Sequence, residues 1–456
     1  MTIRIFFLVL SSLVIALSSG CRTSNPALGL YNQDFQETIR AASTKVFPAV
    51  VYIRVVSANL SSGKDEGNIV SGSGVIISPD GEILTNHHVI DKAREIRCQL
   101  YDGTSYRATV LGSDKDLDIA LLKLALPENS EPLPNAILSP ATVNEGDFVM
   151  AMGAPWGLAR SVSIGIISCS RRYLDSHGKY SLWYQTDASI SPGNSGGPLV
   201  NTAGEVIGIN TLATLIGGTM GFTVPATVIQ SVLARLRQYG EANWAWLGLE
   251  LQPLHDFDRN ITFDYDHGVM VAGTLPGSPA RKAGIQPNDR ITALNGERLT
   301  APQSEDIPDI NRRLGLLPFE VPVSFTVWRN DQQQEITITP IPKGKAEGDE
   351  IAFPRWGFTA KVINRFDNPG LYFYSRKGGV FVYGIDSDGN AAESNLNEQD
   401  VISTVAGKEL NSLSDLEKIY AEALQNIHRQ HFLIFGIIRN GREMQVAIDF
   451  RNEKNK

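Results

Sequence analysis

The feature that most restricts the fold of this chain is an internal repeat in its C-terminal half. The stretch G-V-M-V at 268–271 returns as G-V-F-V at 379–382, and D-R-I at 289–291 returns as D-V-I at 400–402. Both matches have the same offset of 111 residues. A single offset shared by separate matches indicates two copies of one structural module.

The two copies are predicted to span 245–342 and 354–452. Gly284 and Asn395 occupy equivalent positions, and both residue types accept the left-handed conformation that follows a short helix. The stretch between the copies, K-G-K-A-E-G-D-E at 343–350, is charged and contains glycine, which is typical of a hinge.

The region before the repeat, 36–240, has a different pattern. A helical stretch with apolar residues at 35, 39 and 42 is followed by many short runs such as V-V-Y-I-R-V-V and I-A-L-L-K-L. Many short strands separated by Gly, Asp, Asn and Pro predict an all-β sandwich or barrel. An amphipathic helix at 225–239 stops at Gly240 and closes this region.

Each copy of the repeat begins with a similar tetrapeptide, W-L-G-L at 246–249 and R-W-G-F at 355–358. These stretches resemble the carboxylate-binding loops of PDZ domains, in which backbone N–H groups hold a C-terminal carboxylate and the peptide adds a strand to the sheet. The resemblance implies six carboxylate-binding residues, Leu247, Gly248, Leu249, Trp356, Gly357 and Phe358. The alternative is that each tetrapeptide only starts a strand, with Gly at a bulge. Pro308 interrupts the helix expected to form one wall of the first groove.

Residues 191–198, S-P-G-N-S-G-G-P, leave little side-chain bulk around Ser195. Such residues also cluster in ordinary turns, because they supply positive φ angles and short polar side chains. The alternative is that backbone N–H groups converge beside Ser195, as catalysis requires where an oxyanion forms. A serine hydroxyl is a poor nucleophile unless a base takes its proton, so a base has to be found elsewhere in the sequence.

The candidate base and acid come from two other stretches. Of seven histidines, only the pair His87 and His88 in I-L-T-N-H-H-V-I lies in an apolar, strand-flanked context. D-L-D-I-A-L-L-K-L offers Asp116 and Asp118 as the carboxylate that orients such a base. Asp118 leads directly into an apolar run, where burial of a carboxylate is costly unless it is paired, and this favours Asp118.

The chain order of these groups is His, Asp, Ser. G-N-S-G-G also fits the G-x-S-x-G turn of α/β-hydrolases, but the order in that class is Ser, acid, His. The chain order and the β-rich character of 36–240 favour a chymotrypsin-like double β-barrel. The expected fold class is therefore mainly β, a double barrel followed by two PDZ domains.

Together, T-N-H-H-V-I, D-L-D-I-A-L-L-K-L and Q-T-D-A-S-I-S-P-G-N-S-G-G-P-L-V resemble the HtrA/Deg family of trypsin-like serine proteases. The resemblance covers nearly all of the mature chain. Matched residue by residue, it implies that His88, which precedes Val, is the base, Asp118 the acid and Ser195 the nucleophile. It further implies an oxyanion hole formed by the N–H groups of Gly193 and Ser195.

The segment 211–226 resembles the specificity loop and strand that line the first substrate pocket of this family. It carries no acid for a basic side chain, and Leu215, Met220 and Phe222 suggest an apolar pocket suited to small or medium aliphatic residues. The alternative is that these side chains belong to the core. Asp187, in Q-T-D-A, is interpreted as a structural hydrogen-bond acceptor.

The N-terminus predicts export. Arg4 precedes an apolar run at 5–17, shorter than the ~20 residues that span a bilayer and typical of a signal peptide, here 1–20. The following S-S-G-C resembles a bacterial lipoprotein signal, which implies lipidation of Cys21 and a membrane anchor, with a linker over 21–35. An ordinary cleaved signal and an uncleaved anchor are the alternatives. All three place the protein in the periplasm or elsewhere in the cell envelope.

Composition narrows the functional classes. The net charge of −8 argues against nucleic-acid binding. Cys and His residues are few and lack ligand-like spacing, so neither a metal nor a cofactor is predicted. Cys98 and Cys169 leave two alternatives, a disulfide or two separate buried thiols.

The family resemblance implies an ATP-independent serine endopeptidase that degrades misfolded or unassembled proteins, with PDZ modules that bind exposed C-termini. It also implies homotrimers or multiples of trimers, with Tyr31 and Phe35 as candidate contacts. The alternatives are a PDZ-based holdase or scaffold with little proteolysis, and a secreted esterase.

Overall fold

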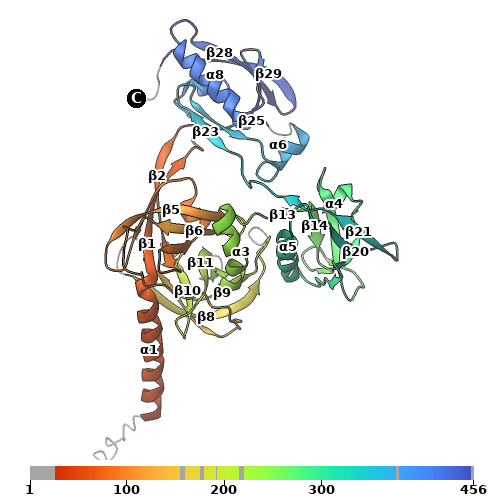
Figure 1. Cartoon of the computed structure of the whole chain (residues 1–456). Helices are drawn as coiled ribbons and strands as arrows, with labels where there is room; N and C mark the ends of the chain where they lie inside the picture. Colours follow the sequence, from red (N-terminus) through yellow and green to blue (C-terminus); the bar gives the residue numbers. More distant parts are fainter. Residues whose placement is uncertain are drawn as a thin grey trace, which may run out of the picture.

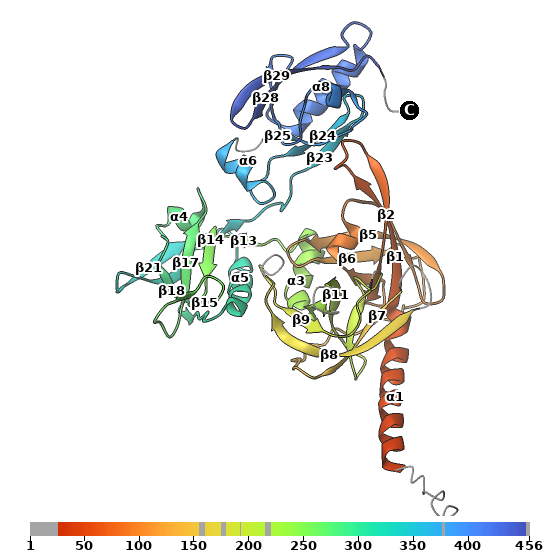
Figure 2. The same ribbon diagram turned by 180° about the vertical axis from the view of Figure 1, so that it is seen from behind.

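The computed structural model describes residues 26–154, 160–174, 179–191, 193–214, 220–375 and 379–452, with only the backbone described for 26–33 and 212–214. Figures 1 and 2 show a double barrel with one projecting helix, and two smaller modules that follow it in the chain. Within these ranges, no helix has the length and apolar character needed to cross a bilayer.

The projecting helix α1, Pro26–Val46, begins inside the stretch that the sequence had assigned to a linker. Pro26 opens the helix, where a missing N–H costs no helical hydrogen bond. The helix is continued by a short turn, η1 (Phe47–Ala49), into the first barrel. Its Phe35 ring contacts the Phe148 ring of the second barrel, with 5.0 Å between the centroids.

Both barrels are closed sheets of antiparallel strands, and each buries one face of its strands. The first has the order β1-β2-β3-β6-β5-β4. Its strands are β1 (Val50–Asn59), β2 (Glu66–Ile76), β3 (Glu82–Thr85), β4 (Ala93–Gln99), β5 (Ser105–Asp114) and β6 (Ile119–Leu124). The second has the order β10-β11-β12-β9-β8-β7. Its strands are β7 (Phe148–Gly153), β8 (Ser161–Arg172), β9 (Trp183–Thr186), β10 (Pro198–Asn201), β11 (Val206–Thr214) and β12 (Met220–Pro225).

The predicted helix after the second barrel is α3, Ala226–Tyr239. It ends at Gly240, whose φ of 77° is the left-handed conformation that favours glycine. Its apolar face lies in one buried cluster with side chains of both barrels, so the helix joins the two barrels into one core.

The first C-terminal module is a twisted sheet with short helices. Its strands are β13 (Ala245–Trp246), β14 (Leu249–Gln252), β15 (His255–Asp256), β16 (Ile261–Thr262), β17 (Val269–Thr274), β18 (Arg290–Leu294), β19 (Glu297–Arg298), β20 (Val323–Arg329), β21 (Gln332–Ile338) and β22 (Ile341–Pro342). Its helical turns are α4 (Pro279–Lys282), η3 (Ser304–Asp306) and α5 (Ile307–Gly315). Pro308 does not break α5, because it lies in the first turn, where proline is tolerated.

The second module repeats the strand order of the first and has one further strand at the edge of its sheet. Its strands are β23 (Glu350–Phe353), β24 (Phe358–Val362), β25 (Val380–Ile385), β26 (Val401–Val405), β27 (Lys408–Glu409), β28 (Phe432–Arg439) and β29 (Arg442–Asp449). Its helices are α6 (Pro369–Tyr374), α7 (Asn390–Glu393) and α8 (Leu413–Gln425). The sheet therefore begins at Glu350, which the sequence had placed in the hinge.

The repeat is visible in the geometry of equivalent residues. Gly284 and Asn395 both have positive φ, 92° and 61°, as the exchange of these two residue types predicted. A buried acid holds an arginine in each module: Arg329 donates through Nε to Asp289 at 2.7 Å, and Arg439 to Asp400 at the same distance. The two modules thus share an ion pair between a buried acid and a partly exposed arginine.

Candidate active site

His88 lies on the short helix α2, His87–Ile90, which directly follows β3. Its Nδ1 lies 2.8 Å from Oδ2 of Asp118, and its backbone N–H donates to Oδ1 of Asp118 at 2.9 Å. The amide of Asn86 also donates to the Asp118 carbonyl oxygen at 2.9 Å. These contacts fix the imidazole with a proton on Nδ1, which leaves Nε2 free to accept one.

Asp118 occupies the turn before β6, and its φ of 53° is unusual for a residue other than glycine. Burial alone would raise the pKa of its carboxyl, but the hydrogen bond and charge of His88 and the hydrogen bond from Thr211 Oγ1 lower that pKa below 3.8. The carboxylate is therefore ionised at neutral pH and stabilises an imidazolium at His88.

Ser195 lies on the loop that leads into β10 in the other barrel. Gly193 and Gly196 have φ of 100° and 84°. A Cβ on Gly196 would lie 2.2 Å from the Ser73 carbonyl oxygen, and one on Gly197 would lie 2.1 Å from that of Met152. The glycines after Ser195 thus allow other main-chain segments to pack closely against this loop. A plain surface turn would not need such residues.

The hydroxyl of Ser195 donates to the Thr211 carbonyl oxygen at 3.2 Å. Thr211 therefore contacts both the candidate acid and the candidate nucleophile. Among the described residues, the N–H groups of Gly193 and Ser195 have no hydrogen-bond acceptor, which is the state expected of oxyanion donors.

Ser73, a fully buried residue on β2, connects the two barrels at this loop. Its N–H donates to the Ser195 carbonyl oxygen at 2.8 Å, and its Oγ donates to that of Gly193 at 2.6 Å. The same Oγ accepts from the Ala154 N–H at 2.8 Å. Ser73 is therefore a positioning residue for the candidate oxyanion loop.

We expect Ser73→Ala to lower kcat by about 10–100-fold with little change in KM, because misaligned oxyanion donors weaken transition-state stabilisation. The matched control is Ser57→Ala on β1, which removes a longer hydrogen bond, 3.4 Å to the Asn68 carbonyl oxygen, away from the loop. Steady-state kinetics on a peptide substrate measure both. Equal kcat losses in the two variants would contradict the positioning role.

The predicted substrate-pocket residues are only partly brought together. Leu215 lies outside the described residues. Phe222 is 7% exposed and belongs to the central core, so its side chain fills the interior, while Met220 is half-buried against that core. Ile190, which was not predicted as a pocket residue, lies beside Gly221: a Cβ on Gly221 would be 2.6 Å from Ile190 Cδ1.

Asp187 accepts the Ile166 N–H at 2.7 Å, as interpreted from the sequence. The cysteines Cys98 and Cys169 are both free, on β4 and β8, so the thiols are separate as one alternative had it, but only Cys98 is buried. Burial raises the pKa of the Cys98 thiol to about 12, which makes it unreactive.

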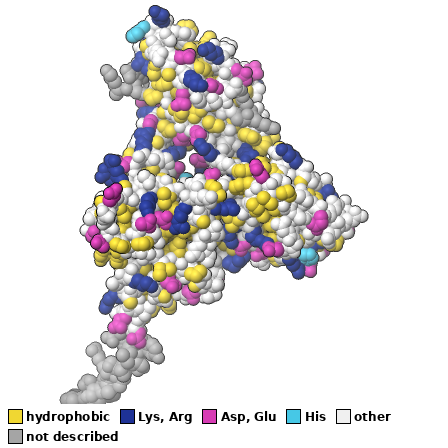
Figure 3. All heavy atoms as spheres, viewed as in Figure 1, with side chains coloured by type: hydrophobic (Ala, Val, Ile, Leu, Met, Phe, Trp, Pro, Cys, Tyr) yellow, Lys and Arg dark blue, Asp and Glu magenta, His cyan; other side chains and the backbone are white. Residues whose placement is uncertain are grey.

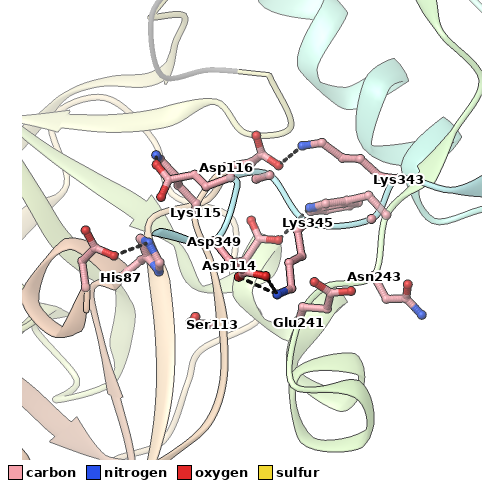
Figure 4. Close-up of a pocket in the computed structure, with 15 residues that line it drawn as sticks. His87, Ser113, Asp114, Lys115, Asp116, Glu241, Asn243, Lys343, Lys345 and Asp349 are labelled. Atoms are coloured by element: carbon pink, nitrogen blue, oxygen red, sulfur yellow. Dashed lines mark hydrogen bonds and ion pairs between the residues drawn. The ribbon is translucent and has the colours of Figure 1, made fainter. Parts of the chain in front are cut away.

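A cavity of about 250 Å³ lies behind the Asp118 turn, between the first barrel and the stretch that joins the two modules (Figure 4). On one wall, Asp114 accepts from Trp244 Nε1 at 2.7 Å and from the Leu117 N–H at 2.9 Å. Burial, and then the charge of Asp116, raises the pKa of Asp114 from 3.8 to about 7.

This pKa predicts that stability falls as pH rises from about 4 to 7. Between pH 3.8 and about 7 the folded chain holds a proton at Asp114 that the unfolded chain releases. The stabilisation is therefore complete below this window and lost as pH rises through it, by up to about 1.4 kcal/mol per pH unit. Urea unfolding at several pH values measures the slope. Asp114→Asn, which cannot ionise, should have a smaller slope, and an unchanged slope would contradict the assignment.

Thr211 and Ser73 are the site residues that sequence reasoning missed. Both act across the boundary between barrels, and neither belongs to a short motif with a known chemical role. The only local signal was the small, polar character of S-G-S-G at 71–74, next to an apolar run.

Two closed β-barrels, with a His–Asp pair on one and a glycine-rich serine loop on the other, define a trypsin-like serine peptidase. The model of the trypsin-like peptidase domain matches residues 72–209, and that of the PDZ domain matches residues 270–329. The chain is 34% identical over 385 residues to a probable periplasmic serine endoprotease, DegP-like, of Pseudomonas savastanoi, covering 81% of this chain and 77% of that one. A relative of the same name from Brucella suis is 32% identical over 372 residues, covering 80% and 71%.

The chain therefore belongs to the HtrA/Deg family and is a serine endopeptidase, which confirms the predicted family and fold class. Solved structures agree. The HtrA-type protease AlgW with a tripeptide has a TM-score of 0.58 at 30% identity, covering 67% of this chain and 97% of that one. A serine endoprotease from Yersinia pestis has a TM-score of 0.51 at 30% identity, covering 66% and 96%.

Proposed function

We propose that this protein is an ATP-independent endopeptidase of the periplasm that degrades misfolded or unassembled proteins, with His88, Asp118 and Ser195 as its catalytic groups. The observation that carries the proposal is the Asp118–His88 pair, held by two hydrogen bonds and connected through Thr211 to Ser195 of the other barrel. The periplasmic location is supported by the names of the relatives and by the N-terminal apolar run.

In this mechanism the Ser195 hydroxyl turns from the Thr211 carbonyl oxygen toward His88, which takes its proton as Oγ attacks a peptide carbonyl. The N–H groups of Gly193 and Ser195 stabilise the oxyanion, and His88 then protonates the leaving amine. A water molecule, deprotonated by the same imidazole, hydrolyses the acyl-enzyme. Asp118 stays ionised throughout and keeps the ring oriented.

The proposed domains are a protease domain at 36–240 and PDZ domains at 245–342 and 354–452. In the first PDZ domain, Leu247 and Gly248 have N–H groups without an acceptor among the described residues, and β14 has only one neighbouring strand, β17. These features support binding of a C-terminal peptide there, with Leu249 at the start of the receiving strand. The second module differs, because β24 already has a partner on each side.

The activity is tested by digestion of unfolded casein by the wild type and by Ser195→Ala, with and without added C-terminal peptides. We expect cleavage only by the wild type. Mapping of the cleavage sites tests the proposed preference for aliphatic residues, which the half-buried Met220 supports. Intact casein under all conditions would refute the proposed peptidase activity and leave the holdase alternative. Turnover of short-chain esters without peptide cleavage would favour the esterase alternative.

We also propose homotrimers, or multiples of them, formed through α1 and the adjacent second-barrel surface. Phe35, Phe148, Val162 and Ile164 are exposed apolar side chains in this region, and such patches mark interaction surfaces. Light scattering should give a trimer mass or a multiple of it, and Phe148→Asp should shift the mass toward the monomer. A monomeric wild type would contradict the proposal.

The lipid anchor at Cys21 is proposed from the sequence, because residues 1–25 lie outside the described part of the structure. Its test is the fractionation of cells that express the wild type or Cys21→Ala. We expect the wild type in the membrane fraction and the variant in the soluble fraction. Retention of the variant in the membrane would favour an uncleaved anchor.

A further inference from the structure

The two C-terminal modules differ at the sheet edge on which a PDZ domain receives its peptide. In the first module, the chain before the W-L-G-L loop leaves the sheet, and β13 pairs with β22. In the second module, the chain before the R-W-G-F loop folds back, and β23 pairs antiparallel with β24, with Phe353 opposite Phe358 and Ile351 opposite Ala360. The edge of β24 is therefore occupied by the same chain.

The N–H groups of the second loop are also occupied. The N–H of Trp356 and that of Gly357 both donate to the Phe353 carbonyl oxygen, at 3.0 and 2.9 Å. The Phe353 carbonyl oxygen thus accepts hydrogen bonds from the two N–H groups that would otherwise bind the carboxylate of a peptide. In the first loop, the N–H groups of Leu247 and Gly248 have no acceptor within the described residues.

The side chains of β23 fill the groove between β24 and α8. Phe353 is 1% exposed, and its ring lies 5.5 Å from that of Phe358 on β24 and 5.2 Å from that of Tyr420 on α8. Ile351, two residues earlier and on the same face, packs against the same apolar cluster. Alternate residues of β23 therefore point into the groove, as the last residues of a bound peptide do.

We infer that β23 is an internal ligand of the second module, so that a free C-terminal peptide binds there only after β23 has left the groove. This builds on the proposed function: in the resting chain, only the first module would bind C-terminal peptides. Tethering favours the internal ligand, because a short connection gives it a high effective concentration.

Departure of β23 would also disturb contacts with the protease domain. Glu350, at the start of β23, forms an ion pair with Lys92 at 2.6 Å, and Lys92 follows the helix that carries His88. Lys343, which follows β22 and lies seven residues before β23, forms an ion pair with Asp116, two residues from Asp118 (Figure 4).

The β1–β2 turn of the first barrel adds further contacts to this module. The Leu60 carbonyl oxygen accepts from Thr359 Oγ1 at 2.7 Å, and Lys64 lies 3.7 Å from Asp386. Both ribbon views show this turn reaching the sheet beside β23 (Figures 1 and 2). Through Glu350, the internal ligand therefore contacts the segment that follows the helix of the base, and the rest of its module contacts the β1–β2 turn.

The first test is amide hydrogen exchange on the full chain carrying Ser195→Ala, so that the probe is not cleaved. The probe is a peptide ending in D-E-I-A-F with a free carboxylate, which copies 349–353. Without peptide, we expect the amides of Trp356 and Gly357 to exchange at least about tenfold more slowly than those of Leu247 and Gly248. Saturating peptide should slow the exchange of Leu247 and Gly248 only.

The second test counts peptide sites per chain by calorimetry in the same background. We expect one site, which Gly248→Val removes by placing a Cβ 2.2 Å from that of Ser278. Adding Ile351→Ala and Phe353→Ala to vacate the groove should raise the count to two sites. If this variant fails to fold, the exchange experiment decides by itself.

The inference is overturned if the peptide binds the second module of the otherwise unaltered chain, or if Trp356 and Gly357 exchange as fast as Leu247 and Gly248. A folded, vacated variant that gains no site also overturns it. Absence of peptide binding at Leu247 and Gly248, with Trp356 and Gly357 still protected, would instead refute the role proposed for the first module.

Discussion

Asp118→Asn is expected to lower kcat by about 10⁴-fold while the chain stays folded. The carboxylate accepts from His88 Nδ1 at 2.8 Å and from the His88 N–H at 2.9 Å. An amide at this position can present its NH₂ group to Nδ1 and so favour the tautomer whose Nε2 carries the proton. That imidazole cannot take the proton of Ser195.

The matched control for this variant is Asp187→Asn. Asp187 is the carboxylate closest to Ser195 in the sequence, but it accepts a backbone N–H of β8, and an amide oxygen can do the same. We expect its activity to remain within a few-fold of the wild type. A large loss in Asp187→Asn together with an active Asp118→Asn would show that the acid has been wrongly assigned. Peptidase assays at pH 8, with circular dichroism as the folding check, measure both variants.

Gly196→Ala is expected to lower kcat/KM by about 10²-fold or more, because its Cβ would displace the oxyanion loop. The new Cβ would lie 2.2 Å from both the Ser73 carbonyl oxygen and Thr85 Oγ1. The carbonyl cannot retreat without moving β2, and the hydroxyl can move only by losing its hydrogen bond to that carbonyl. The positive φ of 84° adds strain of about 1 kcal/mol. We expect the free energy of unfolding to fall by several kcal/mol in total, at roughly the scale of other severe core changes.

The control variant Gly103→Ala separates the strain of a positive φ from the steric contact of the new Cβ. Gly103 has nearly the same φ, 89°, but no other atom of the part of the chain that the structure describes lies within 4 Å of its Cβ position. This variant should lose only about 1 kcal/mol of stability and keep its activity. Equal effects in the two variants would mean that backbone strain, and not the close approach of Ser73 and Thr85, explains the glycine at 196.

Much of the fold could be predicted because its signals are local. Short apolar runs between turn residues predicted the barrels, and a constant offset predicted two modules with the same strand order. The exchange of Gly284 for Asn395 predicted a left-handed backbone at both positions. Pro308 was misjudged because its effect depends on whether it falls in the first turn of a helix or later, and the sequence did not fix where α5 begins.

The parts that could not be predicted depend on contacts between distant segments. Ser73 acquires its role only because β2 of one barrel meets the Gly193 loop of the other. The sequence did not predict β23 as a strand, because D-E-I-A-F combines hinge-like charges with only three apolar residues. Its pairing with β24 follows from the tight turn at R-W-G-F, which the first module does not share.

The distribution of charge agrees with the composition. On the face shown in Figure 3, Lys and Arg side chains are interspersed with Asp and Glu rather than gathered in one basic area. Such a surface gives no electrostatic attraction for a polyanion on that side. It is compatible with a protein whose ligands are polypeptides.

The assignment of Ser195 and His88 as catalytic groups is tested by covalent labelling of Ser195 with a fluorophosphonate, followed by intact and peptide mass spectrometry. The wild type should take up one label per chain, on Ser195, and His88→Ala should slow the reaction by at least about 10³-fold, because the hydroxyl then lacks its base. A label on another residue, or an undiminished rate on Ser195 without His88, would contradict the account.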